Sequence, residues 1–547
     1  MEPSVSSSCS TVKTSYLLML NIAFAVLMIL ANSMSLKVDS VRRVAVVGAG
    51  AGGLITADVL RNDGFEVVIF EKETYVGGVW KYRKSIDKSS STPMYKSLRT
   101  NLPKQIMAYS DTTPFKKSAP SFLSHQDVQT YLEDFTQSRE LLPFIKFGST
   151  VRSISYVQNR GNSAALHTEF SSPSRWRITA SLASSTTATQ TSLKDCVESV
   201  DYFDAVIVCN GHYNIPLIPA AENIGEIIDF DGEIMHSIDY DTPDHFKGKS
   251  VLVVGSRSSG TDLAREISSV ASIVYASDRS LGKEKSALYR NIYHKPGISS
   301  LKSKSLSRLS DSSNFLDSTL KCASQSLEDD KHETISNAST KGLVQFADGS
   351  IVRVDIILWC TGYAYDYPFL DLDGQKCEQT VELEANTVKV TNKRKVENLY
   401  QQVFSISHPT LSFVGLPYAV VPFPLFRLQA LWISSVYSRK KILPSVEKQV
   451  EWLHNKENEI LVKYQGNKEL AIEKFHYLGD SQWEYCRFLS DAAGIVDERQ
   501  LKYIKVTEEI YNDNSLSKPA YPGAPDDYRK VEYSVDNQAL TWNKVPF

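Results

Sequence analysis

The sequence has few cysteines and lacks the short motifs that mark metal-dependent and serine hydrolases. Seven cysteines occur among 547 residues, an odd number, and no two are spaced Cys-x-x-Cys. A disulfide framework, a zinc ribbon and a Cys-x-x-Cys redox dithiol therefore lose support, and we expect no bound metal. The motifs HExxH and GxSxG are absent as well, so the sequence shows none of the motif residues that would support a zinc or serine hydrolase. The formal net charge of −3 gives no indication of a nucleic-acid partner.

Long hydrophobic runs are also scarce. Residues Tyr16–Ala31 form an apolar run interrupted by Asn21, which is short for a membrane span of about 20 residues. Its length fits a signal-peptide core or a marginal signal anchor, and small residues at Ala31–Ser33 suit cleavage. A third interpretation is that the chain starts at Met34. All three stay open, and an anchor would give membrane association through residues 16–31.

Two glycine-rich turns, each between an apolar run and a stretch compatible with a helix, are the main positive signal. The first follows Val44–Val47 and fills GxGxxG with Gly48, Gly50 and Gly53. The three glycines allow a tight turn, close approach of the backbone to a pyrophosphate, and close helix packing, in that order. Glu71, about 20 residues on at the end of the next apolar run, can accept hydrogen bonds from a ribose. The pattern predicts a Rossmann-like α/β unit.

The second turn keeps the outer glycines, Gly255 and Gly260, but has Arg257 at the middle position. The backbone is therefore expected to approach a pyrophosphate less freely there. We still expect a second dinucleotide to bind at Gly255, Ser259 and Gly260.

The charged residue after the second unit distinguishes the two nucleotides. We interpret Arg279, at the end of the strand after the second turn, as the counterpart of Glu71. A guanidinium there suits a 2′-phosphate and favours NADPH over NADH. Asp278 beside it favours NADH instead, and an ordinary exposed arginine is the alternative role for Arg279.

Between the two turns, residues Phe230–Tyr240 fit FxGxxxHxxxY, the identifying motif of flavin-containing monooxygenases. The sequence resembles that family from Val44 to about Leu443, and most closely its plant and fungal members that oxidise sulfur or nitrogen. The likeness includes the segments Asn101–Lys104, Cys209–Tyr213, Cys360–Tyr363 and Phe413–Pro417.

The resemblance implies an FAD-dependent monooxygenase. NADPH would reduce FAD, O2 would add to give a C4a-hydroperoxyflavin, and one oxygen atom would pass to a soft sulfur or nitrogen nucleophile in a small molecule. Asn101 matches the family's active-site asparagine, whose amide can donate and accept near the flavin and NADP. A turn-forming Asn before Leu-Pro is the alternative. His236 in the family motif is expected to be structural rather than an acid or base.

Further cofactor contacts are implied at Gly78, Trp80, Gly362 and Gln429. Gly78 and Trp80 belong to a turn after Glu71, where Trp80 could instead cap the core. Gln429 falls on a helix that approaches the flavin in relatives, and a solvent-facing Gln is the alternative.

The resemblance also implies two nested Rossmann-like domains. The expected limits are 1–40 for the signal- or anchor-like segment, 41–215 and 343–445 for the two parts of the FAD-binding domain, 216–342 for an inserted NADPH-binding domain with a Ser/Lys-rich insertion, and 446–547 for a helical C-terminal region ending in a coil tail beyond Ser517. The serine- and threonine-rich residues 159–200 are interpreted as a hairpin excursion around the strand-like Trp176–Thr179.

Three other functions stay open: a Baeyer–Villiger-type monooxygenase, an NADPH oxidase, and a non-catalytic FAD-binding scaffold. A family motif ending in Tyr240 rather than tryptophan disfavours the first. The expected location is the endoplasmic-reticulum membrane facing the cytosol, or the cytoplasm if the chain starts at Met34. The sequence carries no signal of oligomeric state.

Overall fold

The structure is a computed structural model that describes residues 41–83, 92–157, 176–182, 197–219, 230–279, 285–289, 291–302, 342–370, 387–518, 525–536 and 538–546. The expected signal or anchor at Tyr16–Ala31 and most of the Ser/Lys-rich stretch lie outside these residues. No helix within them has the length and apolar character needed to cross a membrane. The chain forms two compact units, each made of three separate stretches of sequence.

The first unit contains Met1–Val76, Thr136–Asn210 and Tyr367–Ile504, and its centre is a seven-stranded sheet. In spatial order the strands are β21 (Leu399–Tyr400), β22 (Phe404–Ser405), β23 (Leu411–Phe413), β7 (Ala205–Val208), β1 (Arg43–Val47), β2 (Glu66–Phe70) and β3 (Ile145–Lys146). Each pair of neighbouring strands from β23 to β3 is parallel, whereas β21, β22 and β23 pair antiparallel. Parallel neighbours require a crossover, and helix α2 (Ala51–Asn62) supplies it between β1 and β2.

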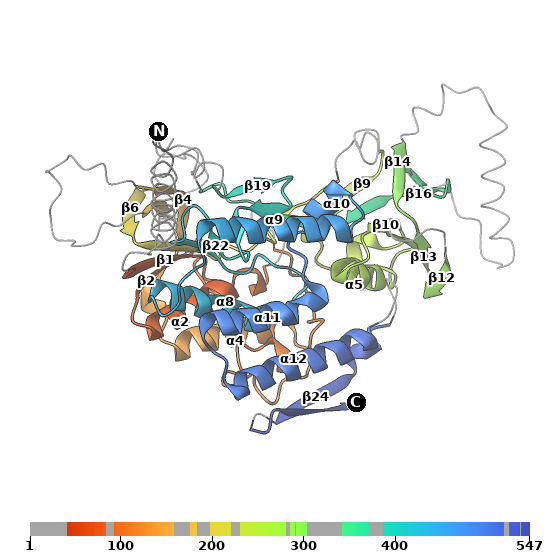
Figure 1. The fold of residues 1–547 in the computed structure, drawn as a ribbon. Coiled ribbons are helices and arrows are strands. Elements are labelled where there is room, and N and C mark those ends of the chain that lie inside the picture. The colour runs from red at the N-terminus through yellow and green to blue at the C-terminus, as the bar shows by residue number, and fades with distance from the viewer. Residues whose placement is uncertain are drawn as a thin grey trace, which may run out of the picture. The chain divides into compact units, whose positions relative to one another are not determined.

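Helix α8 (Pro422–Tyr437) packs against α2 in this unit (Figure 1). It begins at Pro422, a position where a missing N–H costs nothing. Helices and short helical turns that follow or flank the sheet are α9 (Val446–Lys463), α10 (Lys468–Glu473), α11 (Gln482–Ala493), η3 (Leu142–Phe144) and η9 (Gly479–Ser481). The helical C-terminal region expected from the sequence is thereby confirmed.

Smaller antiparallel sheets complete the first unit. They are β4 (Ser149–Tyr156), β5 (Trp176–Leu182) and β6 (Val197–Phe203), and the pair β19 (Lys389–Thr391) and β20 (Lys395–Glu397). Strand β5 confirms the strand expected at Trp176–Thr179. Its residue Trp176 is fully buried, and the indole Nε1 donates to Thr410 Oγ1 at 3.0 Å.

The second unit contains Gly77–Phe135, Gly211–Asp366 and Lys505–Phe547, and its main sheet has six strands. In spatial order they are β12 (Lys285–Tyr289), β13 (Ile292–Lys295), β11 (Ile273–Ser277), β10 (Ser250–Val254), β17 (Ile356–Trp359) and β9 (Glu233–His236). Strand β17 pairs with β10, so the chain leaves this unit only after Asp366. The expected start of the second FAD-binding part at residue 343 stays a prediction.

Both faces of this second sheet are covered, which explains the unbroken apolar sequence of β10. Val251 and Val253 pack into one cluster with residues of helix α5 (Ser258–Ile267). Leu252 packs into a second cluster with the sheet of β14 (Ile298–Lys302), β15 (Gly342–Phe346) and β16 (Ile351–Val354). Alternate side chains of a strand point to opposite faces, so a strand buried on both faces needs apolar residues throughout.

The remaining elements of the second unit are short, apart from helices α4 and α12, which belong in part to each unit. They are η1 (Gly78–Trp80), α3 (Lys104–Met107), α4 (His125–Ser138), β8 (Ile215–Pro216), η6 (Ser237–Asp239), η7 (Pro243–Phe246), β18 (Tyr363–Ala364), α12 (Glu498–Ser517), η10 (Asp527–Arg529), β24 (Val531–Asp536) and β25 (Thr541–Pro546).

The C-terminal tail is not coil throughout, which corrects the expectation beyond Ser517. Strands β24 and β25 pair antiparallel from Val531 opposite Pro546 to Asp536 opposite Thr541. Contacts with distant residues hold this hairpin. The side chain of Glu532 accepts from Ser121 N at 3.0 Å, and Tyr533 is almost fully buried. A local pattern of proline and tyrosine could not reveal these partners.

Candidate functional site

The first glycine turn lies between β1 and α2 and has no room for side chains at two of its glycines. Gly48 has a φ of +105°, and a Cβ there would lie 2.7 Å from the carbonyl oxygen of Cys209. A Cβ on Gly53 would lie 1.8 Å from the carbonyl oxygen of Gly48. Gly50 is the N-cap of α2. The expected turn is therefore present, and Gly48 and Gly53 are required by steric contacts.

Glu71 lies at the end of β2 beside this turn. It is 5% exposed, and its Oε2 accepts from Ala49 N at 2.6 Å while its Oε1 accepts from Glu73 N at 2.9 Å. Burial raises the pKa of Glu71, and the two backbone hydrogen bonds oppose this rise. Each carboxylate oxygen has further lone pairs, so the carboxylate can accept from a ribose as well as from the turn.

Gln429 supports a neighbouring loop from helix α8. The side chain is fully buried, which excludes the solvent-facing alternative. Its Oε1 accepts from Gly415 N at 3.0 Å, and its Nε2 donates to Tyr485 Oη at 3.4 Å. Next to Gly415, Val414 Cγ1 lies 3.5 Å from where a Cβ of Gly52 would be. Gln429 thus holds the loop that packs on the first glycine turn.

Gly78 and Trp80 form the short helical turn η1, which belongs to the second unit. Gly77 and Gly78 have φ values of +110° and +57°, a region that favours glycine. A Cβ on Gly77 would lie 2.1 Å from Gln129 Oε1. Trp80 is partly exposed, which fits either a residue at the edge of the core or a cofactor contact, so its contact with a cofactor stays a prediction.

The second glycine turn, between β10 and α5, repeats the geometry of the first. Gly255 has a φ of +113°, and a Cβ there would lie 2.5 Å from the carbonyl oxygen of Cys360. A Cβ on Gly260 would lie 1.7 Å from the carbonyl oxygen of Gly255. Arg257 caps α5 with φ −81° and ψ −173°, close to the φ −77° and ψ −174° of Gly50. Any residue adopts this extended backbone, so Arg257 costs the turn no strain.

Strand register corrects the correspondence expected between Glu71 and Arg279. Val47 pairs with Phe70, and Val254 pairs with Ser277. Asp278 is therefore the counterpart of Glu71, and Arg279 follows one residue later. The carboxylate of Asp278 accepts from the Ser256 hydroxyl, just as Glu71 accepts from the residue after the first glycine. Arg279 is exposed at the end of the strand, where it can still meet a 2′-phosphate.

His236 is a structural residue of the family motif. It is buried, and its Nδ1 accepts from Ile238 N at 3.2 Å, so Nε2 carries the proton and donates to the carbonyl oxygen of Gly362 at 3.1 Å. Burial lowers the pKa of His236. Gly362 has a φ of +84° and open space at its missing Cβ. Because both ring nitrogens of His236 are engaged, an acid–base role has no support.

Asn101 lies at the second glycine turn. Its Nδ2 donates to Ser258 Oγ at 2.8 Å, and Ser258 is the first residue of α5. The backbone oxygen of Asn101 accepts from Asn514 Nδ2 at 3.1 Å. Both Ser258 and Ser259 are exposed in the first turn of the helix. The structure therefore brings together Asn101, Gly255, Ser259 and Gly260 within the second unit.

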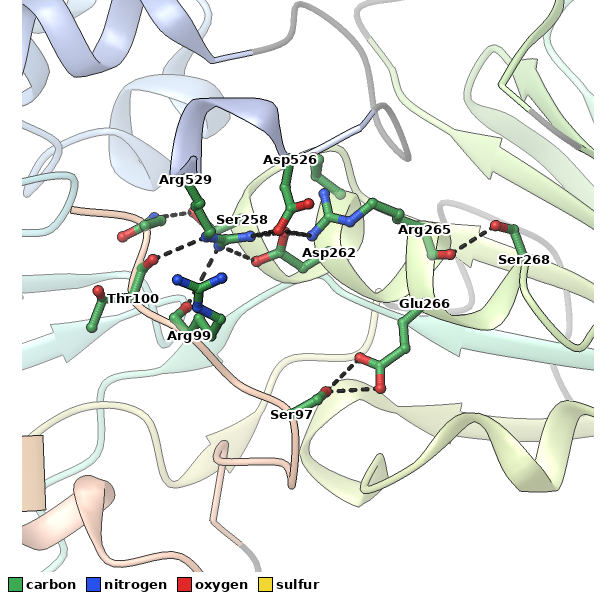
Figure 2. A network of polar contacts seen from close by, with 12 residues as sticks. Ser97, Arg99, Thr100, Ser258, Asp262, Arg265, Glu266, Ser268, Asp526 and Arg529 are labelled. Atoms are coloured by element: carbon green, nitrogen blue, oxygen red, sulfur yellow. Dashed lines mark hydrogen bonds and ion pairs between the residues drawn. The ribbon is translucent and has the colours of Figure 1, made fainter. Parts of the chain in front are cut away.

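Three residues near Asn101 were not found by sequence reasoning: Ser258, Asn514 and Arg529. Figure 2 shows the guanidinium of Arg529 between Asp262 of α5 and the backbone of Thr100. Arg529 and Asp262 are 267 residues apart in sequence, and no local motif joins them. A serine at the start of a helix was the one signal available for Ser258.

Both turns fit a dinucleotide. Helices α2 and α5 start without a side-chain cap and without an acidic residue in the first turn. The amides and the positive end of the helix dipole therefore suit an anionic pyrophosphate. The buried carboxylate of Glu71 suits the ribose of FAD, and the exposed Arg279 suits the 2′-phosphate of NADPH. Two Rossmann-like nucleotide units of this kind define a flavin-dependent oxidoreductase.

Comparison with known proteins identifies the family. The flavin-binding monooxygenase-like family model matches residues 41–293 and 332–489, and the chain belongs to this family. The flavin-containing monooxygenase FMO GS-OX-like 4 of Arabidopsis thaliana is 32% identical over 498 residues, which cover 88% of this chain and 92% of the relative. The protein is therefore an FAD-dependent monooxygenase that uses NADPH, as the resemblance implied.

Solved structures agree with the fold. S-allyl-L-cysteine S-oxygenase from Allium sativum aligns with a TM-score of 0.65 and 28% identity, covering 92% of this chain and 97% of that one. Tmm from a Pelagibacter species aligns with a TM-score of 0.63 and 21% identity, covering 91% and 95%. The expected α/β fold with two nucleotide-binding domains is confirmed.

Proposed function

We propose that the protein uses NADPH and O2 to transfer one oxygen atom to a soft nucleophile in a small molecule, with the sulfur of a thioether as the preferred acceptor. The observation that carries this proposal is the 2.8 Å hydrogen bond from Asn101 Nδ2 to Ser258 Oγ at the start of α5. It supports a role for this amide beside the nicotinamide coenzyme. The likeness to an S-oxygenase of 28% identity supports sulfur over nitrogen.

The site residues divide by cofactor. FAD would be bound in the first unit at Gly48, Gly50, Gly53 and Glu71, beside the loop that Gln429 holds. Gly78 and Trp80, in the second unit, stay predicted cofactor contacts. NADPH would be bound at Gly255, Ser259, Gly260, Arg279 and Gly362. The Asp278 carboxylate accepts from the Ser256 hydroxyl, and its negative charge stays the argument against a 2′-phosphate at this position.

Bound FAD would supply the redox chemistry by which two electrons pass from NADPH to O2, so that one oxygen atom of O2 goes to the acceptor and the other leaves as water. The chain itself must hold both nucleotides, exclude water and place hydrogen-bonding groups. An amide donates and accepts at the same time. With Nδ2 directed to Ser258, Asn101 presents Oδ1 as an acceptor to a bound nucleotide, and a carboxylate or an alkyl group could not replace it in both functions.

Rapid mixing of the purified full chain tests the proposal. The protein is reduced by NADPH without oxygen and then mixed with O2 while the flavin spectrum is followed. We expect a lasting spectrum that differs from both the reduced and the oxidised flavin, and that decays faster when dimethyl sulfide is added. Mass spectrometry should then find one dimethyl sulfoxide per NADPH.

The other outcomes separate the alternatives. Immediate return to oxidised flavin with stoichiometric peroxide would indicate an NADPH oxidase. A lack of reduction by NADPH would indicate a scaffold. Oxidation of trimethylamine without oxidation of the sulfide would overturn the sulfur preference, and conversion of cyclohexanone to a lactone would indicate a Baeyer–Villiger enzyme.

A further inference from the structure

We propose that the C-terminal segment positions Asn101 at the NADPH turn, and that Arg529 is the principal positioning residue. The C-terminal clasp, as we name it, consists of Asn514, Asp526 and Arg529. The inference rests on the proposed function, because Asn101 matters only if its amide serves the bound nucleotides. It concerns residues beyond the last position, 489, of the family match.

One polar stripe of α5 holds the segment from Ser97 to Asn101. Ser258, Asp262 and Glu266 are spaced four residues apart, so they lie on one face of the helix. Glu266 accepts from Ser97 Oγ at 2.7 Å, and Ser258 accepts from Asn101 Nδ2 at 2.8 Å. Eight helical residues span about 12 Å, and four residues reach at most about 13 Å, so the segment is long enough to follow the stripe. Asp262 lies between Ser258 and Glu266 on the stripe, and it therefore faces the middle of the segment.

Arg529 links Asp262 to this segment. Its Nη2 donates to Asp262 Oδ2 at 2.8 Å and its Nη1 to Asp262 Oδ1 at 3.1 Å. Its Nε donates to the carbonyl oxygen of Thr100 at 3.0 Å (Figure 2). The side chain is 3% exposed. Only arginine has a planar guanidinium whose N–H groups can donate to a carboxylate and to a carbonyl at once. Lysine has a single ammonium group.

Asn514 holds the next carbonyl along the chain. Its Nδ2 donates to the backbone oxygen of Asn101 at 3.1 Å, and its side chain is fully buried at the end of α12. Arg529 and Asn514 thus fix the carbonyls of two consecutive residues, Thr100 and Asn101. Fixing these two peptide units restricts the directions in which the Asn101 side-chain amide can point. Residues that surround a site commonly hold its functional side chains in place in this way.

The charges of the clasp are balanced where they are buried. Asp526 Oδ2 lies 3.3 Å from Arg529 Nη1 and 4.0 Å from Arg265 Nη2. Burial opposes ionisation of Asp262, but Arg529 and Arg265 outweigh this effect and lower its pKa. Removing the guanidinium would leave the Asp262 carboxylate without its bidentate partner and the Thr100 carbonyl without its donor, so the segment would lose its central attachment to α5.

The test compares variants of the full chain. In Arg529→Met we expect NADP+ to bind about tenfold more weakly. A loss of this size lies within the range found for residues that affect a site without contacting its ligand. The KM for NADPH should rise while the limiting rate of flavin reduction falls less, and more peroxide should form per NADPH. Arg529→Lys should be intermediate. Adding Asp262→Asn to Arg529→Met should cost little more, because the pair is already broken.

A matched control is Lys544→Met. Lys544 Nζ forms an ion pair with Asp513 at 2.7 Å in the same C-terminal region, without a contact to residues 97–101 among the described residues. We expect wild-type NADP+ affinity from it. FAD content should be unchanged in every variant, since the first glycine turn belongs to the other unit.

Unchanged NADP+ affinity in a folded Arg529→Met protein would overturn the inference, and so would an equal loss in Lys544→Met. If Arg529→Met does not fold, Asn514→Ala is used instead and should weaken NADP+ binding while keeping FAD. NADP+ affinity is measured on the oxidised protein without substrate. Failure to form a sulfoxide would therefore refute the proposed function while leaving this test intact.

Discussion

Gly53, the last glycine of the GxGxxG motif in the first turn, gives the sharpest prediction of the structure. A Cβ on Gly53 would lie 1.8 Å from the carbonyl oxygen of Gly48, whereas real Cβ contacts stay above 3.0 Å. In Gly53→Ala the start of α2 must therefore move by more than 1 Å. Overpacking of this kind costs about 1–3 kcal/mol, and the shift would displace the amides that we propose bind the pyrophosphate. We expect FAD to bind about 10- to 100-fold more weakly.

Gly52→Ala, in the same turn, is the matched control. A Cβ there would lie 3.5 Å from Val414 Cγ1 and 3.8 Å from Phe426 Cδ2, which is ordinary van der Waals contact. Alanine in place of glycine within a helix stabilises by about 0.5–1 kcal/mol. The assays are the ratio of flavin absorbance to protein after purification, and thermal unfolding with and without added FAD. Wild-type flavin content in Gly53→Ala, together with a Tm no lower than that of Gly52→Ala, would refute the steric argument.

Gly260→Ala should weaken NADP+ binding but keep FAD, because its Cβ would lie 1.7 Å from the Gly255 carbonyl oxygen in the second unit; loss of flavin would contradict this. Arg279→Ala should raise the KM for NADPH about tenfold more than that for NADH, and equal effects in steady-state assays would argue against a 2′-phosphate contact. Burial lowers the pKa of His408 from 6.5 to about 4. The unfolded chain therefore binds a proton first, and stability falls as the pH drops from 6.5 towards 4, by at most about 3 kcal/mol for this group. His408→Gln should flatten the urea-unfolding profile in that range, and an unchanged slope would show that other groups dominate.

Local patterns predicted the parts of the site that depend on local geometry. The strand, the glycine turn and the helix are contiguous in sequence, so the spacing of Gly48, Gly50 and Gly53 was sufficient to locate the first turn. Glu71 was found for the same reason, since it ends the next strand. The error of one residue at Arg279 arose where the pattern was weaker. The pairing of Val254 with Ser277, which identifies Asp278 as the counterpart of Glu71, is visible only in the paired strands.

Contacts between distant segments could not be predicted. The burial of Gln429 excludes its solvent-facing alternative, and the contacts of its amide with Gly415 and Tyr485 could not be predicted from the sequence. The C-terminal hairpin was missed because its stability depends on partners more than 400 residues away, such as Ser121 for Glu532. Side-chain alternation in Val531–Asp536 was the available signal, but a two-stranded hairpin is marginal on its own.

Helix α5 shows why a polar helix face is easily misread. Its buried residues Gly260, Leu263, Ala264 and Ile267 recur at helical spacing and pack on the second sheet. The opposite stripe of Ser258, Asp262 and Glu266 would ordinarily be taken for a solvated surface. Here each member of the stripe binds a side chain from elsewhere in the chain, namely Asn101, Arg529 and Ser97. If the coenzyme binds at the N-terminus of the same helix, as we propose, a displacement of α5 would move the pyrophosphate site and the Asn101 amide together. We then expect substitutions along the polar stripe of α5 to change coenzyme binding and the placement of Asn101 in parallel.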